Sequence, residues 1–340
     1  MKRKSPKSYS FATRSQRGMK AIVLTRYGSP DVLQFEEVEK PAAMGNQVLV
    51  KVHAASANPL DWHGVSGKPF IARLMGSGIL KPKDPRVGAD VAGRVEAVGN
   101  DVTEFKPGDE VFGGCNGSFA EYAVAREDRL ALKPANLSFE EAAAVPVAAY
   151  TALQGLRDKG KIQPGQKVLV NGASGGVGTF AVQIPKSFGA EVTGVCSTRN
   201  LDMVRKIGAD HVIDYTQEDF TKEGQRYDLI LDAVGNHSIS DYKRALTSEG
   251  ICVVVGFSSM SRLLQHLIVG PLASKTGSKK ISMMLTKPNK KDLVIVKELL
   301  KTEKVVPVID RRYPLSEVPE ALRYLEGGHA QGKVVITVQP

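Results

Sequence analysis

The strongest constraint on this chain is a short apolar segment that runs directly into a glycine-rich turn and then into a helical pattern. Residues 168–178 read Val-Leu-Val-Asn-Gly-Ala-Ser-Gly-Gly-Val-Gly, and apolar residues with helical spacing follow at once, at 180–184. A helix N-terminus offers free backbone N–H groups and the positive end of the helix dipole, which suit a pyrophosphate. The segment therefore predicts a dinucleotide-binding turn formed by Ala173, Ser174, Gly175, Gly176, Val177 and Gly178.

The residues about twenty positions further on indicate which dinucleotide is bound. NAD-binding units place an acidic residue there, on the ribose hydroxyls. This chain instead reads Cys-Ser-Thr-Arg-Asn over 196–200. A carboxylate would repel a 2′-phosphate, whereas the Ser197 hydroxyl and the Arg199 guanidinium would bind one. The predicted cofactor is NADPH, and the predicted class is an NADPH-dependent oxidoreductase.

Alternating strands and helices after the turn predict a doubly wound parallel sheet of the Rossmann type. Apolar runs recur at 191–196, 211–215, 227–232 and 251–256, and a helical stretch at 201–207 follows Asn200, its expected N-cap. Such alternation implies right-handed crossovers and parallel strands. Residues 139–280 are expected to form the cofactor domain. A doubly wound domain that binds no nucleotide is the alternative.

The basic residues are concentrated at the N-terminus. The net charge is +10, and the first 18 residues hold six cations and no acid. We expect residues 1–18 to form a disordered extension, with organelle targeting as the alternative in a eukaryotic protein. No basic stripe with interleaved aromatic residues supports nucleic-acid binding. The three cysteines have no paired spacing, which fits a reducing, cytoplasmic compartment.

Residues 19–138 read as short strands separated by turns, and helical spacing is scarce before Phe139. The runs at 48–53 and 91–98 alternate in part, and Pro107-Gly-Asp is a turn that leads into another strand. A β domain that precedes an α/β domain leaves a cleft between them, where a substrate can meet a nicotinamide.

Four motifs together resemble the medium-chain dehydrogenase/reductase superfamily across residues 19–340. They are Ala-Asp-Val-Ala-Gly-Arg-Val at 89–95, Pro-Gly-Asp-Glu-Val at 107–111, Ala-Ser-Gly-Gly-Val-Gly at 173–178 and Gly-Lys-Val-Val-Ile at 332–336. The chain is similar to the zinc-free quinone oxidoreductase-like branch, of the zeta-crystallin, chloroplast envelope quinone oxidoreductase and reticulon-interacting mitochondrial protein type. The resemblance implies an α/β protein with a discontinuous, mostly-β GroES-like catalytic domain (19–138 and 281–340) and a Rossmann domain. It also implies a homodimer, paired through an edge strand at 281–285.

The side chains at the zinc positions of this superfamily argue against a catalytic metal. Zinc alcohol dehydrogenases of the superfamily have a Cys after the third strand and a Gly-His-Glu further on, whereas this chain has Asn58 and Gly88-Ala89-Asp90. A catalytic zinc needs three protein ligands of Cys, His or carboxylate type. Ala89 cannot bind a metal, and Asp90 alone is not a site. We therefore expect no zinc.

Without a Lewis acid, an acceptor that is already electrophilic is favoured: a quinone or an α,β-unsaturated carbonyl. Negative charge then develops on a carbonyl oxygen, and the site needs hydrogen-bond donors. The Asn58 amide and the Thr151 hydroxyl are the candidate donors, and the resemblance places Asn58 and Asp61 beside the nicotinamide. Asn-Pro is also a common turn, which Asp61 could simply brace. His63 is a packed or solvated histidine in the favoured interpretation.

The resemblance implies further cofactor contacts, each with a plain alternative. Thr151 lies by the nicotinamide, or its hydroxyl bonds its own helix backbone. Tyr215 lies beside the adenine ribose phosphate, or it is an ordinary aromatic residue at a strand end. Lys333 reaches the cofactor phosphates, or it is a solvated surface lysine. The carboxyl end of a strand supplies Gly256, Phe257 and Ser258.

Three functions compete with a quinone reductase. They are an alkenal or enone reductase with little quinone activity, a non-catalytic NADPH-binding structural or interaction protein, and the disfavoured zinc alcohol dehydrogenase. The apolar and basic segment from Leu263 to Lys280 raises one further alternative, contact with a membrane surface. We expect this segment to line the substrate entrance instead.

Overall fold

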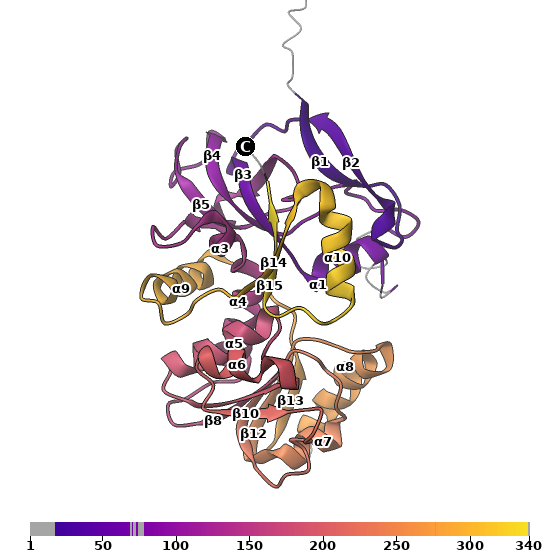
Figure 1. Ribbon diagram of the computed structural model, residues 1–340, viewed down its shortest axis with the longest axis vertical. Helices are drawn as coiled ribbons and strands as arrows, with labels where there is room; N and C mark the ends of the chain where they lie inside the picture. Colours follow the sequence, from indigo (N-terminus) through magenta and orange to yellow (C-terminus); the bar gives the residue numbers. More distant parts are fainter. Residues whose placement is uncertain (1–17, 69, 71–72, 74–77, 276, 339–340) are drawn as a thin grey trace, which may run out of the picture.

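The computed structural model describes residues 18–68, 70, 73, 78–275 and 277–338, so the extension expected at 1–18 lies outside the described residues apart from Gly18. Figure 1 shows two lobes stacked along the long axis of the molecule. We call the upper one, built on a seven-stranded sheet, the β-rich lobe. The lower one, built on a six-stranded sheet, is the Rossmann lobe.

The β-rich lobe is assembled from both ends of the chain. Its sheet has the strand order β14-β15-β3-β4-β5-β7, and β6 pairs with β3. The last strand, β15, runs antiparallel to β3, with Val335 opposite Ser56. A separate antiparallel hairpin, β1–β2, lies beside the sheet. The strands are β1 (Gly18–Leu24), β2 (Leu33–Glu39), β3 (Gln47–Ala57), β4 (Asp90–Val98), β5 (Glu110–Gly114), β6 (Tyr122–Arg126), β7 (Leu130–Leu132), β14 (Ile309–Pro314) and β15 (Lys333–Thr337).

The Rossmann lobe contains the parallel sheet that the sequence predicts. Its strand order is β10-β9-β8-β11-β12-β13, and every neighbouring pair is parallel. The order reverses between β8 and β11, the switch point beside which such sheets bind ligands. The strands are β8 (Lys167–Asn171), β9 (Glu191–Cys196), β10 (His211–Asp214), β11 (Tyr227–Asp232), β12 (Leu246–Val254) and β13 (Lys280–Met283).

Strand β13 extends this sheet beyond residue 280, the end of the cofactor domain predicted from the sequence. Ile281 pairs with Cys252 of β12, and β13 is the last strand of the sheet order. Residues 281–283 therefore hydrogen-bond with the Rossmann sheet, whereas β14 and β15 belong to the sheet of the β-rich lobe.

The helices cover the sheets and join the lobes. α5 lies against β8 and β9, and α9 packs on α4 and β7 at the waist between the lobes (Figure 1). α10 lies beside α1 and β14 in the β-rich lobe. The helices are α1 (Pro59–Ser66), α3 (Phe139–Ala143), α4 (Pro146–Gln154), α5 (Gly176–Ser187), α6 (Leu201–Lys206), α7 (Ile239–Ala245), α8 (Met260–Lys275), α9 (Lys290–Lys301) and α10 (Val318–Glu326).

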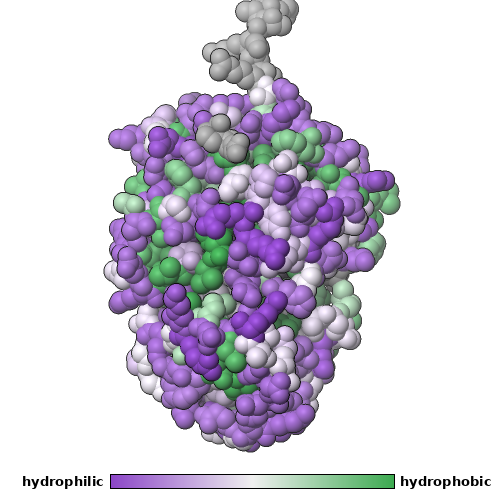
Figure 2. All heavy atoms as spheres, in the orientation of Figure 1, coloured by the Kyte–Doolittle hydropathy of each residue, from purple (hydrophilic) through white to green (hydrophobic). Residues whose placement is uncertain are grey.

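One hydrophobic cluster runs through both lobes. It contains Ala92 and Phe112 of the β-rich sheet together with Val168, Phe180 and Leu229 of the Rossmann lobe, all fully buried. Apolar burial stabilises by about 25 cal/mol per Å². The shared core therefore holds the two lobes in one packed body, while the face shown in Figure 2 is mostly polar with scattered apolar patches.

Helix α8 carries the apolar segment that the sequence identified. Leu264, Leu267 and Ile268 are 49%, 50% and 59% exposed. Among the described residues, no helix combines the length and the hydrophobicity needed to cross a membrane.

The shared core yields a stability prediction. Phe180→Ala removes a fully buried ring from it, so the free energy of unfolding should fall by about 3–5 kcal/mol. Phe35, which is 47% exposed on β2, supplies the matched control, and Phe35→Ala should change stability by less than about 0.5 kcal/mol. Denaturant unfolding measures both, and equal losses would contradict the assignment of Phe180 to the core.

Candidate functional site

The glycine turn lies where the sequence predicts, between β8 and α5. Gly175 is the N-cap of α5, and Gly176 begins the helix. A Cβ on Gly178 would come within 2.0 Å of the Gly172 carbonyl oxygen, so the helix can approach the turn this closely only with glycine at 178. The first turn of α5 thus presents its N–H groups at the carboxyl end of β8, an arrangement suited to a phosphate.

The Asn200 side chain contacts this turn through a hydrogen bond that the sequence did not predict. It occupies the N-cap position of α6, but its side chain makes no capping bond. Its Nδ2 instead donates to the Ser174 and Ser197 hydroxyls, at 3.0 and 3.1 Å. Its Oδ1 is buried and has no hydrogen-bond partner among the described residues. A free buried acceptor here fits a ligand that carries hydroxyl groups, such as a nucleotide ribose.

The three residues expected at the adenosine end lie near each other, after β9 and β10. Ser197 is the N-cap of the 3-10 helix at 198–200. The exposed Arg199 guanidinium donates to the His329 carbonyl at 2.8 Å. Tyr215 is 60% exposed, and its backbone N–H donates to Cys196. Asp214, the last residue of β10, precedes Tyr215, and its oxygens accept from the side chains of Thr198 and Thr216.

Asn58 and Asp61 form a capping box at the start of α1. The Asn58 backbone N–H donates to Asp61 Oδ2 at 2.8 Å. The Asn58 Nδ2 donates to Asp90 Oδ2 at 2.9 Å and to the Ser56 carbonyl at 3.2 Å, while its Oδ1 accepts from Lys333 Nζ at 2.5 Å. Asp61 therefore braces the turn, and both amide hydrogens of Asn58 already have protein acceptors.

Asp90, to which no role was assigned from the sequence, lies at the centre of this cluster. Its carboxylate is completely buried. Oδ2 accepts from Ser56 Oγ at 2.7 Å and lies 3.4 Å from the Lys333 ammonium, and Oδ1 accepts from the Val147 N–H, at 2.9 Å, in the first turn of α4. Ionised side chains are buried only with such partners. No pattern in the sequence indicated this ion pair, because its members are far apart along the chain.

The environment of Asp61 also affects its titration. Burial, and after it the neighbouring Asp90 charge, raise the pKa of the Asp61 carboxyl to about 7, although the hydrogen bonds from Asn58 and the Lys333 charge oppose this rise. The same environment raises the pKa of the Cys115 thiol to about 12, mainly through burial. Cys115 is therefore a neutral thiol at physiological pH, and Asp61 titrates near neutrality.

Thr151 lies one turn along α4 from this cluster. Its hydroxyl is within hydrogen-bond distance of the Val147 carbonyl, at 2.7 Å, and of the Thr286 hydroxyl, at 2.6 Å. The first contact is the backbone alternative weighed from the sequence. The second comes from the segment after β13, and no sequence pattern indicated Thr286.

Aromatic side chains connect α1 to the loop after β12. The His63 ring stacks on Phe257, with ring centroids 5.2 Å apart, and the Trp62 ring is tilted against His63, with centroids 4.5 Å apart. His63 Nδ1 lies 3.0 Å from the Lys68 carbonyl, which can only accept, so the neutral ring carries its proton on Nδ1. Next to Phe257, the Ser258 hydroxyl donates to Gly235, against which the Gly256 backbone packs.

The described residues contain no group of three His, Cys, Asp or Glu side chains that could hold a metal ion. At the positions considered from the sequence, Asn58 is an amide, and the oxygens of Asp90 already accept bonds from four protein groups.

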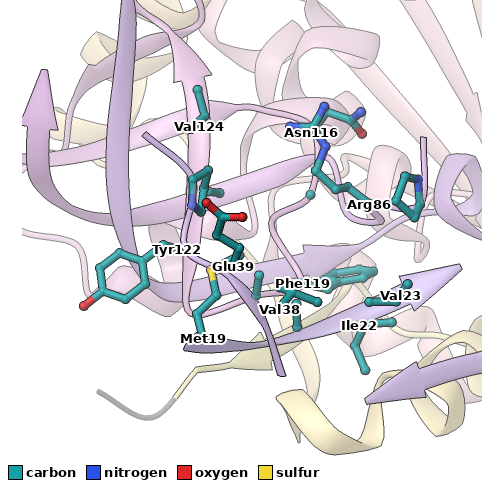
Figure 3. Close-up of a pocket in the computed structure, with 16 residues that line it drawn as sticks. Met19, Ile22, Val23, Val38, Glu39, Arg86, Asn116, Phe119, Tyr122 and Val124 are labelled. Atoms are coloured by element: carbon teal, nitrogen blue, oxygen red, sulfur yellow. The ribbon is translucent and has the colours of Figure 1, made fainter. Parts of the chain in front are cut away.

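None of the candidate-site residues described above lines the pocket shown in Figure 3. It has a volume of about 310 Å³ and is formed by the β1–β2 hairpin and by segments around Arg86 and Tyr122. Most of the side chains in it are apolar, among them Met19, Val38 and Phe119, and none of the residues predicted from the sequence lines it. The described residues that line it include no helix N-terminus and no glycine-rich turn.

The fold and the glycine turn define a two-domain, nucleotide-binding α/β protein. Residues 44–135 match the family described as alcohol dehydrogenase GroES-like domain, and residues 207–336 match the family described as zinc-binding dehydrogenase. The chain belongs to the medium-chain dehydrogenase/reductase superfamily, in its quinone oxidoreductase-like branch.

Individual relatives cover most of the chain. The mitochondrial NAD(P)H oxidoreductase RTN4IP1 of Mus musculus is 36% identical over 94% of this chain and 89% of the relative. The 2-methylene-furan-3-one reductase of Solanum lycopersicum is 38% identical over 94% of this chain and 79% of the relative. The quinone oxidoreductase structure from Coxiella burnetii has a TM-score of 0.83 at 32% identity and covers 95% of this chain and all of that one.

The close packing at Gly178 yields a second prediction. Gly178→Ala places a Cβ against the Gly172 carbonyl, so the turn must shift, and we expect a loss of about 1–3 kcal/mol of stability together with about tenfold weaker NADPH binding. At Gly175 the nearest atom to an added Cβ is 3.5 Å away, so Gly175→Ala should leave the free energy of unfolding nearly unchanged. Thermal unfolding and fluorescence titration with NADPH test both variants. Full stability and affinity in Gly178→Ala would contradict the packing argument.

Proposed function

We propose that the protein is an NADPH-dependent reductase of quinones or α,β-unsaturated carbonyls that works without a metal ion. The observation that carries this proposal is the contact between the glycine turn and the Asn58–Asp90–Lys333 cluster. The Gly332 N–H donates to the Ser174 carbonyl at 2.8 Å, one residue before Lys333 reaches Asn58. A dinucleotide on the turn would thus have its reactive end next to a buried polar cluster.

The residues around the turn fit the cofactor. The N–H groups at 176–178 would hold the pyrophosphate, and the free Asn200 Oδ1 would accept from a ribose hydroxyl. Ser197 and Arg199 would hold the 2′-phosphate, beside Tyr215. Phe257 and Thr151 would flank the nicotinamide. When bound, NADPH supplies a hydride, and the protein's part is to orient it and to exclude water.

The cluster at α1 supports chemistry without a Lewis acid. Asn58 and Asp61 shape the wall beside the acceptor and are held rigidly, because each has its partners within the protein. The Lys333 ammonium supplies positive charge near the oxygen on which negative charge develops. The side chains at the zinc positions of the superfamily, Asn58 and Ala89, would leave a metal short of ligands.

The relatives' names favour this class of substrate. Names among them include quinone oxidoreductase, 2-methylene-furan-3-one reductase and alkenal/one oxidoreductase. An enone reductase with little quinone activity is the second candidate. We propose a homodimer, and we keep the cytoplasm as the expected location, although several relatives are named as mitochondrial or chloroplastic.

A panel of acceptors tests the proposed reaction. NADPH oxidation should proceed with quinones or with alkenals, and prolonged treatment with a strong chelator should leave the rate unchanged because no step uses a metal. Simple alcohols should not be oxidised by NADP⁺. Loss of the rate on chelation with recovery on added zinc would refute the metal-free proposal, and NADPH binding without turnover of any acceptor would favour a non-catalytic protein.

The 2′-phosphate site yields a separate prediction. Arg199→Ala should raise KM for NADPH about tenfold or more, because a charge-assisted hydrogen bond is worth about 1.5–3 kcal/mol. KM for NADH should hardly change. Arg205, which pairs with Asp202 on the surface of α6, provides the control, and Arg205→Ala should alter neither constant. Equal increases for both coenzymes in Arg199→Ala would exclude this residue from the phosphate site.

A further inference from the structure

Lys333 lies at the junction between the nucleotide-binding turn and the β-rich lobe. It begins β15, directly after Gly332, whose φ of +96° and close approach to Val308 require glycine. The stem of Lys333 passes the start of α5, because a Cβ on Gly176 would come within 3.1 Å of Lys333 Cδ. The side chain therefore runs past the turn towards α1.

The ammonium group is buried and does not lie on the surface. Lys333 is 3% exposed, and its Nζ contacts Asn58 Oδ1 and Asp90 Oδ2. The sequence offered two roles for this residue, a ligand of the cofactor phosphates or a solvated surface lysine. The geometry excludes the second, and it directs the charge of Lys333 at two side chains of the β-rich lobe.

Lys333 fixes the orientation of the Asn58 amide. An ammonium group only donates, so the amide oxygen must face Lys333 and the NH2 group must face Asp90 and the Ser56 carbonyl. If the amide rotated by half a turn, it would point its NH2 group at the ammonium and its oxygen at a carboxylate. Lys333 and Asp90 together therefore permit a single orientation.

Lys333 also compensates a second buried carboxyl. Asp61 accepts from Asn58 through Oδ2, and its other oxygen makes no hydrogen bond within the described part of the chain. The titratable and charged groups that face it are Asp90 on β4, Lys333 on β15 and the Cys115 thiol after β5. Of these, only Lys333 carries positive charge.

We propose that Lys333 is a positioning residue: it couples the nucleotide-binding turn to Asn58 and balances the carboxylates of Asp90 and Asp61 beside the site. This inference rests on the proposed reductase function, which it deepens. Because the coupling runs through a buried charge, its loss affects the protonation of Asp61 and the rate of the reaction more than the affinity for the nucleotide.

Lys333→Met tests the proposal, because it keeps most of the stem and removes the charge. With NADPH and a quinone, kcat should fall at least about tenfold, because small displacements at a site are costly, while KM for NADPH should stay within about threefold. Removal of the positive charge raises the pKa of Asp61, so the pH at which activity declines should move upward from near 7 by about one unit. Asp61→Asn should abolish this inflection.

Three further variants separate charge from packing. Lys333→Arg keeps the charge and should keep the inflection near its wild-type position. Lys333→Met combined with Asp90→Asn removes one charge of each sign, so the inflection in the pH dependence of activity should return towards its wild-type position. Lys304→Met, at an exposed lysine after α9, should change nothing. A tenfold increase in KM for NADPH with unchanged kcat and inflection would make Lys333 a phosphate ligand and overturn the proposal, as would a Lys333→Met variant identical to wild type.

A readout without turnover keeps this test independent of the proposed reaction. The fold raises the pKa of Asp61, so the stability it contributes is present at acid pH and is lost as the pH rises through the folded value near 7. In Lys333→Met this loss should occur at higher pH, with NADPH affinity nearly unchanged. If the wild-type protein reduces no acceptor, but the pH dependence of stability still moves upward in Lys333→Met, the proposed function fails and the charge coupling stands. No shift alongside normal turnover refutes the coupling alone.

Discussion

The carboxylate of Asp90 is the interaction on which the rest of the site depends. It is fully buried, and four donors converge on it from β3, the start of α1, the start of α4 and β15. An isolated buried charge would be too costly to retain, so each of these elements must keep its place for the Asp90 carboxylate to keep its hydrogen-bond partners. The carboxylate thereby fixes the relative positions of segments from both ends of the chain.

That constraint extends to the nucleotide site through one short segment. Gly332 bonds the turn after β8, and the next residue carries the ammonium that meets Asp90. The shared hydrophobic core supplies most of the packing between the lobes, but it has no directional preference. Hydrogen bonds to a buried charge do have one. Polar contacts therefore set the position of the glycine turn relative to Asn58, and the hydrophobic core stabilises that arrangement.

The sequence predicted the features that depend on local patterns. The order of apolar runs and glycines predicts the parallel sheet, and the strand–turn–helix at 168–187 is confirmed. Asn58 and Asp61 lie close together because they are three residues apart on one capping box. The roles of Asp90, Thr286 and Lys333 could not be predicted, because their partners are between 32 and 275 residues away along the chain. Asn200 occupies the predicted N-cap position of α6, but its side chain bonds to Ser174 and makes no capping bond.

The most direct measurement is the free energy of unfolding of Asp90→Asn by denaturant titration at neutral pH. Loss of one partner of a buried ion pair leaves the other uncompensated, and the expected cost is about 3–5 kcal/mol. Asp128→Asn, which breaks the exposed pair with Arg126, should cost less than about 1 kcal/mol. Equal, small losses in the two variants would contradict the claim that the Asp90 charge holds the site together.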